Sequence, residues 1–323
     1  MKNILLLATG GTIASAMTVN GLTPALSAEE LLEFIPDITE VANLSVRQLF
    51  NLDSTNIDPS HWTAIVKTIK EEYDNYDGFV VTHGTDTMAY TAAAMFFMIE
   101  YPKKPIVITG SQRPITDERG DGASNLSDAI VAASKAPGGV YCVFDHKVMS
   151  AKSIRKVRTH DFNAFMPVNA PILALVEGHH LSHMMGTVGN TVFHEKITAK
   201  VGVLTLVPGL PARLLQDLAQ DLDGIIIEAF GAGGIPTLNG QWAAAIEKLV
   251  KDHKPVVIST QVLSDGTHLQ SYEVGVTALR AGALEAGMLT PEACFTALSL
   301  AISEARDYRM VKDLYASMQT RLI

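Results

Sequence analysis

Short apolar runs alternate with longer amphipathic stretches along the first 145 residues. The apolar runs predict strands at 3–8, 44–49, 78–82, 105–109 and 139–144. The amphipathic stretches predict helices at 28–35, 59–75, 86–100 and 122–135, each behind a capping or turn residue: Ser27, Asp58, Thr85 or Asp121. Because the strands lack polar alternation and helices separate them, the pattern predicts a parallel sheet covered on both faces.

The pattern changes twice further along the chain. Between 147 and 182 the pieces become shorter and more polar, which predicts hairpins at a loop-rich edge, and residues 183–199 have no clear period and suggest a linker. A second α/β alternation follows. Its strands are predicted at 201–207, 223–228 and 255–259, and its helices at 211–220, 240–252, 274–282, 290–304 and 307–320.

A chain of 323 residues is too long for one ordinary core. The two alternations therefore predict two α/β domains. The larger N-terminal parallel-sheet domain spans 1–185, a linker spans 186–200, and a smaller flavodoxin-like or Rossmann-like domain spans 201–323.

Composition narrows the possible partners. Hydrophobic residues make up 47% and charged residues 18%, as in a well-packed globular protein. The net charge of −9 argues against a nucleic-acid partner, because neutralising phosphates needs clustered Lys and Arg. The one basic stretch, 147–158, is interpreted as a solvated loop face.

Neither the first residues nor the cysteines suggest export. The apolar run at 4–8 is only five residues long and no cleavage pattern follows it, which favours a buried first strand over a signal peptide. No run approaches the roughly 18 apolar residues of a spanning helix, so no membrane partner is predicted. Cys142 and Cys294 lie among apolar neighbours and imply no disulfide framework. A cytoplasmic location is expected.

Polar residues cluster where the predicted strands end. Ligands of open parallel sheets bind outside the carboxyl ends of the strands. Four turns at these ends are rich in Thr, Ser, Asp and Gly: 9–13, 51–56, 82–88 and 109–114. We therefore place the candidate site there, for a small-molecule substrate.

Two of these turns carry threonines behind glycines. Gly10 and Gly11 allow a sharp turn that exposes Thr12, although a tight turn with a capping threonine is an equal interpretation. Thr85 and Asp86 are predicted at the first positions of a helix, where free N–H groups could hold an oxyanion, although both residue types are ordinary there. The co-occurrence of the two turns favours a functional interpretation.

A hydroxyl nucleophile needs a base, and the sequence leaves its identity open. His83 adjoins the second turn but suits a structural role equally well. Lys156 is available within 153–159, although spacing alone does not distinguish it from its basic neighbours. The histidines His179, His180 and His183 have no Cys or carboxylate partners in the pattern, so neither a metal nor another cofactor is predicted.

Taken together, the turns resemble the bacterial-type L-asparaginase family, in particular its cytoplasmic (type I) branch. The segments ATGGTIAS at 8–15 and YDGFVVTHGTDTMAYTAAA at 76–94 match two family signatures. The segments NLDSTNIDP (51–59), PIVITGSQ (105–112) and DGIIIEAFGAGGIP (223–236) follow the family's order. The resemblance therefore covers nearly the whole chain.

The resemblance implies a role for each site residue. Thr12 is the acylated nucleophile, and Thr85, Lys156 and Asp86 form a hydroxyl–amine–carboxylate relay. Ser54 binds the substrate's α-carboxylate, Asp86 its α-ammonium, and the backbone of Ser111 contacts the scissile amide nitrogen. The implied substrate-binding set is Gly11, Asp53, Ser54, Thr55, Gly84, Thr85, Asp86 and Ser111.

The resemblance also implies an activity. Family members hydrolyse L-asparagine to L-aspartate and ammonia by two-step acyl transfer without metal or cofactor, as dimers or dimers of dimers. A neighbour's second domain completes each site, and Tyr272 or Glu273 is the candidate contribution. Glutamine or another amide as substrate, the amidase half of a tRNA-dependent amidotransferase, and a non-catalytic amino-acid sensor are the alternatives.

Two positions depart from the family pattern. Many members carry a tyrosine on the mobile loop where Leu22 stands here, so Thr18, Thr23 or water replaces it, or the loop acts as a lid. Gly233 and Gly234 replace a Gly-Asn pair, which leaves the intersubunit contact open.

Overall fold

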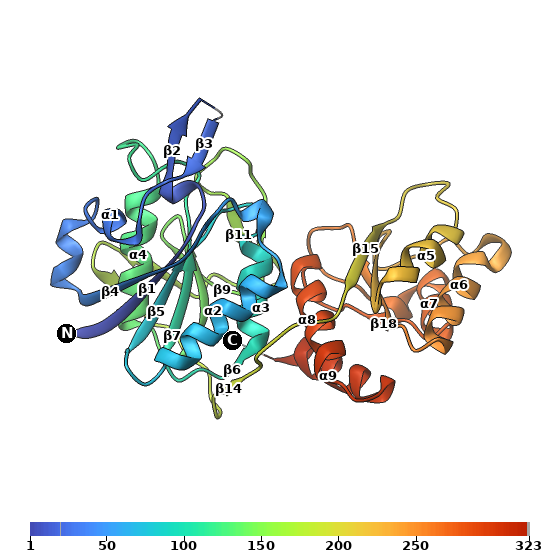
Figure 1. Ribbon diagram of the computed structural model, residues 1–323. Helices are drawn as coiled ribbons and strands as arrows, with labels where there is room; N and C mark the ends of the chain where they lie inside the picture. Colours follow the sequence, from blue (N-terminus) through green and yellow to red (C-terminus); the bar gives the residue numbers. More distant parts are fainter. Residues whose placement is uncertain (20, 322–323) are drawn as a thin grey trace. The chain divides into compact units, whose positions relative to one another are not determined.

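The computed structural model describes residues 1–19 and 21–321, apart from the side chains of Thr18 and Leu22. These residues form two compact units, Met1–Lys196 and Ile197–Arg321 (Figure 1). Each unit contains a central sheet with helices on both faces, which confirms the predicted fold class of two α/β units, the first of them larger. The division falls inside the range 186–200 that the sequence assigns to a linker.

The first unit is built on an eight-stranded mixed sheet in the order β13-β12-β9-β8-β7-β5-β1-β4. Its parallel part contains the five predicted strands: β1 (Lys2–Gly10), β4 (Ala42–Leu52), β5 (Gly78–Thr82), β7 (Pro105–Thr109) and β8 (Gly139–Phe144). The antiparallel edge, with the hairpins expected at 147–182, consists of β9 (Lys147–Ser150), β12 (Ala174–Glu177) and β13 (His180–Leu181).

Helices cover both faces of this sheet, which explains why its central strands are continuously apolar. Leu31 of α1 (Ala28–Leu32) and Ala129 of α4 (Gly122–Lys135) pack with Ile4, Val80 and Val107 on one face. On the other face lie α2 (Pro59–Glu72) and α3 (Met88–Met98), which contact each other (Figure 1). Strands β5, β7 and β8 are buried along their whole lengths.

The order of the strands places a switch point between β1 and β5. These strands are neighbours, but the connection after β1 leads to β4 on one side, whereas the connection after β5 leads to β7 on the other. The two connections therefore diverge above the shared carboxyl ends, which is the place where ligands of open α/β sheets bind.

Several short elements of the first unit were not predicted. They are the hairpin β2 (Ser15–Thr18) and β3 (Gly21–Pro24), the pair β6 (Ile99–Glu100) and β14 (Val192–Phe193), and the 3₁₀ helices η1 (Thr12–Ala14), η2 (Pro36–Glu40) and η3 (Ser54–Asn56). The antiparallel pair β10 (Ile154–Lys156) and β11 (Phe165–Pro167), by contrast, lies within the range 147–182 where hairpins were expected. β14 lies within the range assigned to a linker, and its pairing with β6 ties that part to the first unit.

Several predicted boundaries were wrong, and three of these differences lie in the first half of the first unit. Helix α3 begins at Met88, so Thr85 and Asp86 lie in a bend before it and not in its first turn. Helix α1 ends at Leu32, because Pro36 disfavours helical conformation in the residue before it and starts η2 instead. β4 continues to Leu52, so the turn predicted from 51 begins at Asp53.

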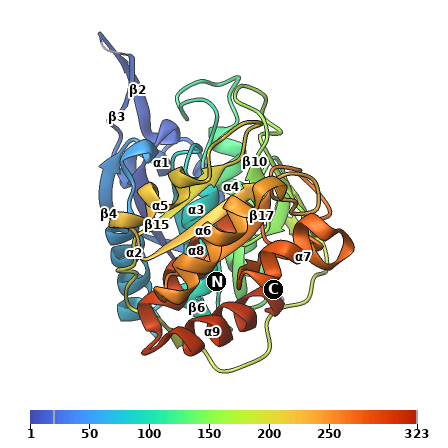
Figure 2. The same ribbon diagram turned by 90° about the vertical axis from the view of Figure 1, so that its right-hand side faces the viewer.

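The second unit contains four parallel strands in chain order: β15 (Val201–Thr205), β16 (Gly224–Ala229), β17 (Val256–Thr260) and the unpredicted two-residue β18 (Leu284–Glu285). One face packs against α5 (Arg213–Leu218), α6 (Gln241–Lys251) and α7 (Glu273–Arg280). The opposite face packs against α8 (Pro291–Glu304), and α9 (Tyr308–Thr320) packs against α8 (Figure 2). Short 3₁₀ helices complete it: η4 (Ala219–Asp221), η5 (Leu238–Gly240) and η6 (Leu269–Ser271).

Each unit contains one free cysteine. Cys142 lies in β8 and Cys294 in α8, and both are fully buried. Burial raises the pKa of both thiols because it disfavours the thiolate. Both therefore behave as small apolar core residues.

Candidate active site

The turn after β1 is in backbone contact with the turn after β5. Gly10 and Gly11 have φ angles of 98° and 81°, which favour glycine. A Cβ atom added to Gly11 would lie 2.3 Å from the backbone nitrogen of Gly84, closer than non-bonded atoms can approach. The two glycines therefore allow the two threonine-bearing turns to meet at the switch point.

Thr12 follows this contact directly. It is the first residue of η1 and is half-buried, whereas Ile13 and Ala14 behind it are fully buried. The Ile13 carbonyl accepts a hydrogen bond of 3.0 Å from the N–H of Ile115, so η1 is fastened to the segment after β7. Thr12 is thus held at the carboxyl end of β1 by buried neighbours on the same short helix.

The turn after β4 reaches the same point. A Cβ added to Gly84 would lie 2.7 Å from the Cβ of Ser54, so the two residues are in contact. Ser54 is buried at the start of η3, and its carbonyl accepts a 2.7 Å hydrogen bond from the hydroxyl of Thr87. Three strand ends therefore converge on Gly11, Gly84 and Ser54.

Asp53 and Thr55 flank Ser54 and are exposed. The carboxylate of Asp53 accepts hydrogen bonds from the hydroxyl and the N–H of Thr55, at 2.7 and 2.9 Å, and these lower the pKa of Asp53. The two side chains thus engage each other and close the turn around Ser54.

The turn after β7 reaches the same place. A Cβ added to Gly110 would lie 2.2 Å from the carbonyl oxygen of His83, so this turn is also in backbone contact with the turn after β5. Ser111 is fully buried and its hydroxyl donates to the carbonyl of Arg113. The next residue, Gln112, reaches the second threonine, because its Oε1 accepts a 3.2 Å hydrogen bond from the hydroxyl of Thr85.

A lysine from a distant hairpin contacts the turn after β5. Lys156 ends β10 and pairs with Phe165 of β11, whose buried ring lies 5.0 Å from that of Phe144. The Nζ of Lys156 lies 2.8 Å from the Thr85 hydroxyl and 2.6 Å from a carboxylate oxygen of Asp86. Thr85 is buried, the Lys156 side chain is 18% exposed and Asp86 is open to solvent. A hydroxyl, an amine and a carboxylate therefore form one connected group.

His83 does not belong to this group, although it precedes Gly84. It is fully buried, and burial lowers its pKa to about 4, so the ring is neutral at pH 7. Its Nδ1 lies 2.7 Å from the Gly84 carbonyl, and its Nε2 lies 2.9 Å from the hydroxyl of Thr91, which also accepts the indole N–H of Trp62. Both ring nitrogens are occupied, so His83 anchors the turn after β5.

The sequence of this chain is similar to those of known proteins over nearly its whole length. Residues 3–186 match the family description "Asparaginase, N-terminal", and residues 200–315 match "Glutaminase/Asparaginase C-terminal domain". An L-asparaginase of Thermococcus kodakarensis is 40% identical over 315 residues, which is 96% of each chain. The chain belongs to the asparaginase family. The family predicted from the sequence is thereby confirmed.

Further relatives span nearly the whole chain. L-asparaginase 1 of Escherichia coli is 31% identical over 325 residues, 96% of this chain and 95% of the relative. A glutamyl-tRNA(Gln) amidotransferase component of Methanosphaera stadtmanae is 30% identical over 343 residues, 99% of this chain and 76% of that relative. The solved L-asparaginase of Thermococcus kodakarensis matches with a TM-score of 0.91 at 39% identity, covering 97% and 96% of the two chains.

The structure brings most of the predicted asparaginase-family residues to one place. Gly11, Thr12, Ser54, Gly84, Thr85, Asp86, Ser111 and Lys156 all lie in the four turns or on the hairpin that contacts them. Thr18 and Leu22, singled out for the missing loop tyrosine, have side chains outside the described part of the structure. Thr23 pairs with Ala16 in the β2–β3 hairpin and is exposed.

Two contacts were missed from the sequence. Gln112 binds Thr85, and Thr87 binds the carbonyl of Ser54. Both lie inside segments quoted for the family resemblance, but each acts on a residue at least 27 positions away along the chain. Their polar side chains beside small site residues were the only signal.

The remaining candidates stay apart from the four turns. His180 and His183 are exposed at or after β13, and His179 is half-buried before it. Within residues 1–19 and 21–321 no group of three or more His, Cys, Asp or Glu side chains is placed to hold a metal ion. None of the helices in this described part is both long and apolar enough to cross a membrane.

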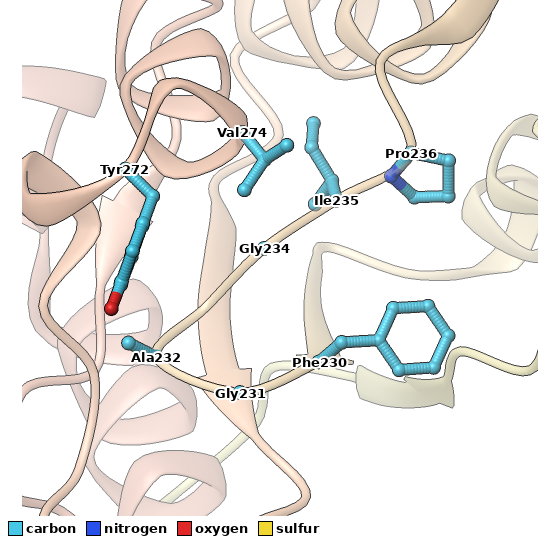
Figure 3. Close-up of a pocket in the computed structure, with 8 residues that line it drawn as sticks. All are labelled: Phe230, Gly231, Ala232, Gly234, Ile235, Pro236, Tyr272 and Val274. Carbon is cyan, nitrogen blue, oxygen red and sulfur yellow. The ribbon is translucent and has the colours of Figure 1, made fainter.

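A cavity of about 620 Å³ lies in the second unit, at the loop after β16. Its lining is mostly apolar and consists of Phe230, Gly231, Ala232, Gly234, Ile235, Pro236, Tyr272 and Val274. Figure 3 shows the Tyr272 and Phe230 side chains flanking the loop from Gly231 to Gly234. The lining has no ionisable carboxyl, amine or imidazole group, so it suits contact with an apolar surface better than acyl transfer.

Proposed function

We propose that this protein hydrolyses L-asparagine to L-aspartate and ammonia through an acyl-enzyme on Thr12. The observation that carries the proposal is the convergence of the Thr12 turn with the Thr85–Lys156–Asp86 group at the switch point. Family membership and the similarity to proteins named L-asparaginase support the choice of substrate.

The reaction has two steps. In the first, the Thr12 hydroxyl oxygen bonds to the side-chain amide carbon, the carbon–nitrogen bond breaks, and the nitrogen leaves as ammonia with the hydroxyl proton. In the second, water attacks the β-aspartyl ester, releases aspartate and returns the proton to Thr12. Dividing one difficult displacement into two through a covalent intermediate is the advantage of such a nucleophile.

The Thr85–Lys156–Asp86 group is the proton path in this proposal. Neutral Lys156 takes a proton from the Thr85 hydroxyl, 2.8 Å away, while Thr85 takes one from the attacking hydroxyl or water. Asp86 holds the lysine in place through the 2.6 Å contact, which is a hydrogen bond while the amine is neutral and an ion pair once it has taken the proton. The N–H groups of Thr85 and Asp86, in the bend before α3, stabilise the oxyanion.

Substrate recognition uses the opposite charges of an amino acid. The buried hydroxyl of Ser54 binds the α-carboxylate and the exposed carboxylate of Asp86 binds the α-ammonium. The Ser111 backbone faces the leaving amide, and the Asp53–Thr55 interaction keeps the turn around Ser54 closed. Groups at both ends of a zwitterion fix its side-chain amide in one place.

We further propose that the active form is a homo-oligomer, a dimer or a dimer of dimers, in which the second unit of one copy faces the site of another. Tyr272, which lines the apolar cavity after β16, is 66% exposed, and Leu238, two residues beyond the lining residue Pro236, is 87% exposed. Exposed apolar surface of this kind marks interaction sites. Tyr272 and Glu273, at the start of α7, are the groups proposed to reach the neighbouring copy.

A cytoplasmic location is also proposed. Both cysteines are free and buried, which is common in proteins of reducing compartments.

The deciding experiment measures ammonia release from L-asparagine and L-glutamine over a range of concentrations. Efficient release from asparagine supports the proposal. Preference for glutamine favours the amidase alternatives, for which the similarity to the amidotransferase component argues. Tight amino-acid binding without turnover identifies a sensor, and a sigmoidal curve reveals allostery.

Two substitutions test the assigned roles. Thr12→Ala and Lys156→Met should each lower kcat by at least about 10³-fold with the fold retained, because each removes a group that takes part in bond making or proton transfer. Thr39→Ala and Lys67→Met, at exposed positions, are the matched controls. Wild-type ammonia release by Thr12→Ala would rule out this nucleophile.

A further inference from the structure

Gln112 makes three side-chain hydrogen bonds around the proton path. Its Oε1 accepts from the Thr85 hydroxyl at 3.2 Å. Its Nε2 donates to the carbonyls of Asp161 and Arg158 at 3.2 and 3.4 Å. These carbonyls belong to the segment that follows Lys156. The side chain of Gln112 therefore connects the turn after β5 to the segment that contains the lysine.

The backbone of Gln112 is fixed independently. Its N–H lies 2.9 and 3.0 Å from the two carboxylate oxygens of Asp121, a buried residue just before α4. The same carboxylate accepts from the N–H of Arg113 at 3.1 Å and from the Asn125 side chain at 3.1 Å. These bonds to Asp121 fix the backbone from which the side chain of Gln112 extends.

The direction of these bonds follows from what each group can do. Carbonyl oxygens only accept, so the NH₂ group of Gln112 must face Arg158 and Asp161. Its Oε1 then faces Thr85, and because that oxygen also only accepts, the Thr85 hydroxyl must be the donor. The Thr85 oxygen thus turns its lone pairs toward the Lys156 amine, which donates to it.

We propose that Gln112 is a positioning residue that holds the Thr85 proton away from Lys156, so that the lysine amine donates to the Thr85 oxygen. The inference rests on the proposed function, because it refines the proton path assigned there. For Thr85 to pass its proton to neutral Lys156, its O–H must leave Gln112 and turn toward the lysine. Gln112 therefore controls the orientation from which the Thr85 hydroxyl enters the proton path.

The described hydrogen bonds and ion pairs bring four charged residues to Lys156 and Gln112. Asp86 contacts Lys156 at 2.6 Å from the turn after β5. The carboxylate of Asp121, just before α4, contacts Gln112 through the backbone N–H and not through the side chain. Arg158 and Asp161 form an ion pair of 3.6 Å and reach Gln112 through their carbonyls. A substitution that keeps the backbone of Gln112 leaves these charges unchanged.

Two substitutions predict opposite shifts. Gln112→Met keeps the length of the side chain but cannot accept a hydrogen bond, so Thr85 is free to donate to neutral Lys156. The titration midpoint of the Lys156 amine should fall by about half a pH unit. Gln112→Glu adds a negative charge beside the lysine, and the midpoint should rise by at least as much.

Two readouts follow the midpoint. One is the ¹³Cε resonance of Lys156 in lysine-labelled protein, assigned with Lys156→Arg. The other is the acidic limb of the pH profile of kcat/KM for asparagine, which should move in the same direction while KM changes less than about twofold. Gln220→Met, at an exposed position of η4, is the control for the Gln-to-Met change.

The outcomes are distinct. Unchanged midpoints in both variants, with folded protein confirmed by thermal unfolding, overturn the inference even if activity falls. If Gln112→Met does not fold, Gln112→Leu, which also cannot accept a hydrogen bond, takes its place and should shift the midpoint in the same direction, whereas Gln112→Glu alone reports only the added charge. If the midpoints shift as predicted but the wild-type protein releases no ammonia from asparagine, the proposed function fails while the positioning of Thr85 stands.

Discussion

Two buried titratable side chains of the first unit have pKa values displaced in opposite directions. Burial lowers the pKa of His83 to about 4. Burial also raises the pKa of Asp128 to about 6, despite its contact of 2.8 Å with the exposed His146. In both cases burial favours the neutral form. For His83 the neutral form is the deprotonated imidazole, and for Asp128 it is the protonated carboxyl group.

The pKa of His83 predicts a pH-dependent stability. Because the folded value lies below the ordinary 6.5, the unfolded chain binds the proton first, and the stability contribution of His83 is complete above about pH 6.5. It is lost as the pH falls toward 4, by about 3 kcal/mol in all. Urea unfolding of the wild type and His83→Gln at pH 7.5, 5.5 and 4.5 measures it, and the variant should lose less stability on acidification.

The comparison with the variant isolates His83 from Asp128. The raised pKa of Asp128 gives a contribution that is complete below about pH 3.8 and lost as the pH rises through 6, so it acts in the opposite direction over part of the same range. Subtracting the unfolding free energy of the variant from that of the wild type at each pH removes the contribution of Asp128, which both proteins share. Equal pH slopes in both would show that His83 does not titrate as its burial requires.

At the scale of elements, the strand ends are held together by glycines. The contact between Gly11 and Gly84 predicts that Gly11→Ala is severely disruptive, because the added Cβ would overlap the backbone of the turn after β5 as well as occupy a φ of 81°. We expect a loss of at least about 3 kcal/mol in unfolding free energy and loss of ammonia release.

Gly209→Ala is a matched control for this prediction. Gly209 has a similar φ of 86°, but a Cβ there would meet no atom within 4 Å. Gly209→Ala should lower the unfolding free energy by about 1 kcal/mol, which is the cost of the unfavourable φ alone, and should not change the activity. Equal destabilisation of the two variants, measured by urea unfolding, would mean that backbone strain and not contact between the turns determines the effect.

The sequence predicted the elements whose signals are local. Central strands such as β5 and β7 are continuous apolar runs, and helices such as α2 and α4 begin behind Asp58 and Asp121, so their positions were correct. Pairs such as β6 and β14 are two residues long and depend on partners about 90 positions away, which no local pattern contains.

The topology also contains a feature that general rules do not predict. The steps from β5 to β7 and from β7 to β8 run in the same direction across the sheet, yet α3 and α4 lie on opposite faces (Figure 1). One of these crossovers is therefore left-handed, against the strong right-handed preference. Sequence periodicity carries no information on this choice.

Some residues of the candidate site could likewise be predicted from local sequence signals, and others could not. The four turns could be located from the sequence because strand ends in a parallel sheet share one edge. Lys156 could not, because it comes from an antiparallel hairpin 70 positions beyond Asp86, and only the family resemblance singled it out. Gln112 was missed because its role depends on three partners that the fold assembles.

At the scale of the whole molecule, the exposed apolar face of the second unit predicts self-association. If the proposed oligomer forms through this face, replacing Tyr272 with Asp should lower the sedimentation coefficient and reduce ammonia release, because the new charge would be buried in the contact between copies. Val188→Asp, at a fully exposed position of the first unit, is the control. An unchanged sedimentation coefficient for Tyr272→Asp would place the contact between copies elsewhere.

The two buried thiols give each unit its own internal reporter. A thiol-specific reagent in solution cannot reach Cys142 in β8 or Cys294 in α8 unless the surrounding core separates, and the raised pKa of each keeps the reactive thiolate scarce. Labelling at either position therefore counts openings of one unit only. Comparing the two labelling rates in unmodified protein reveals whether the two units open together or one at a time.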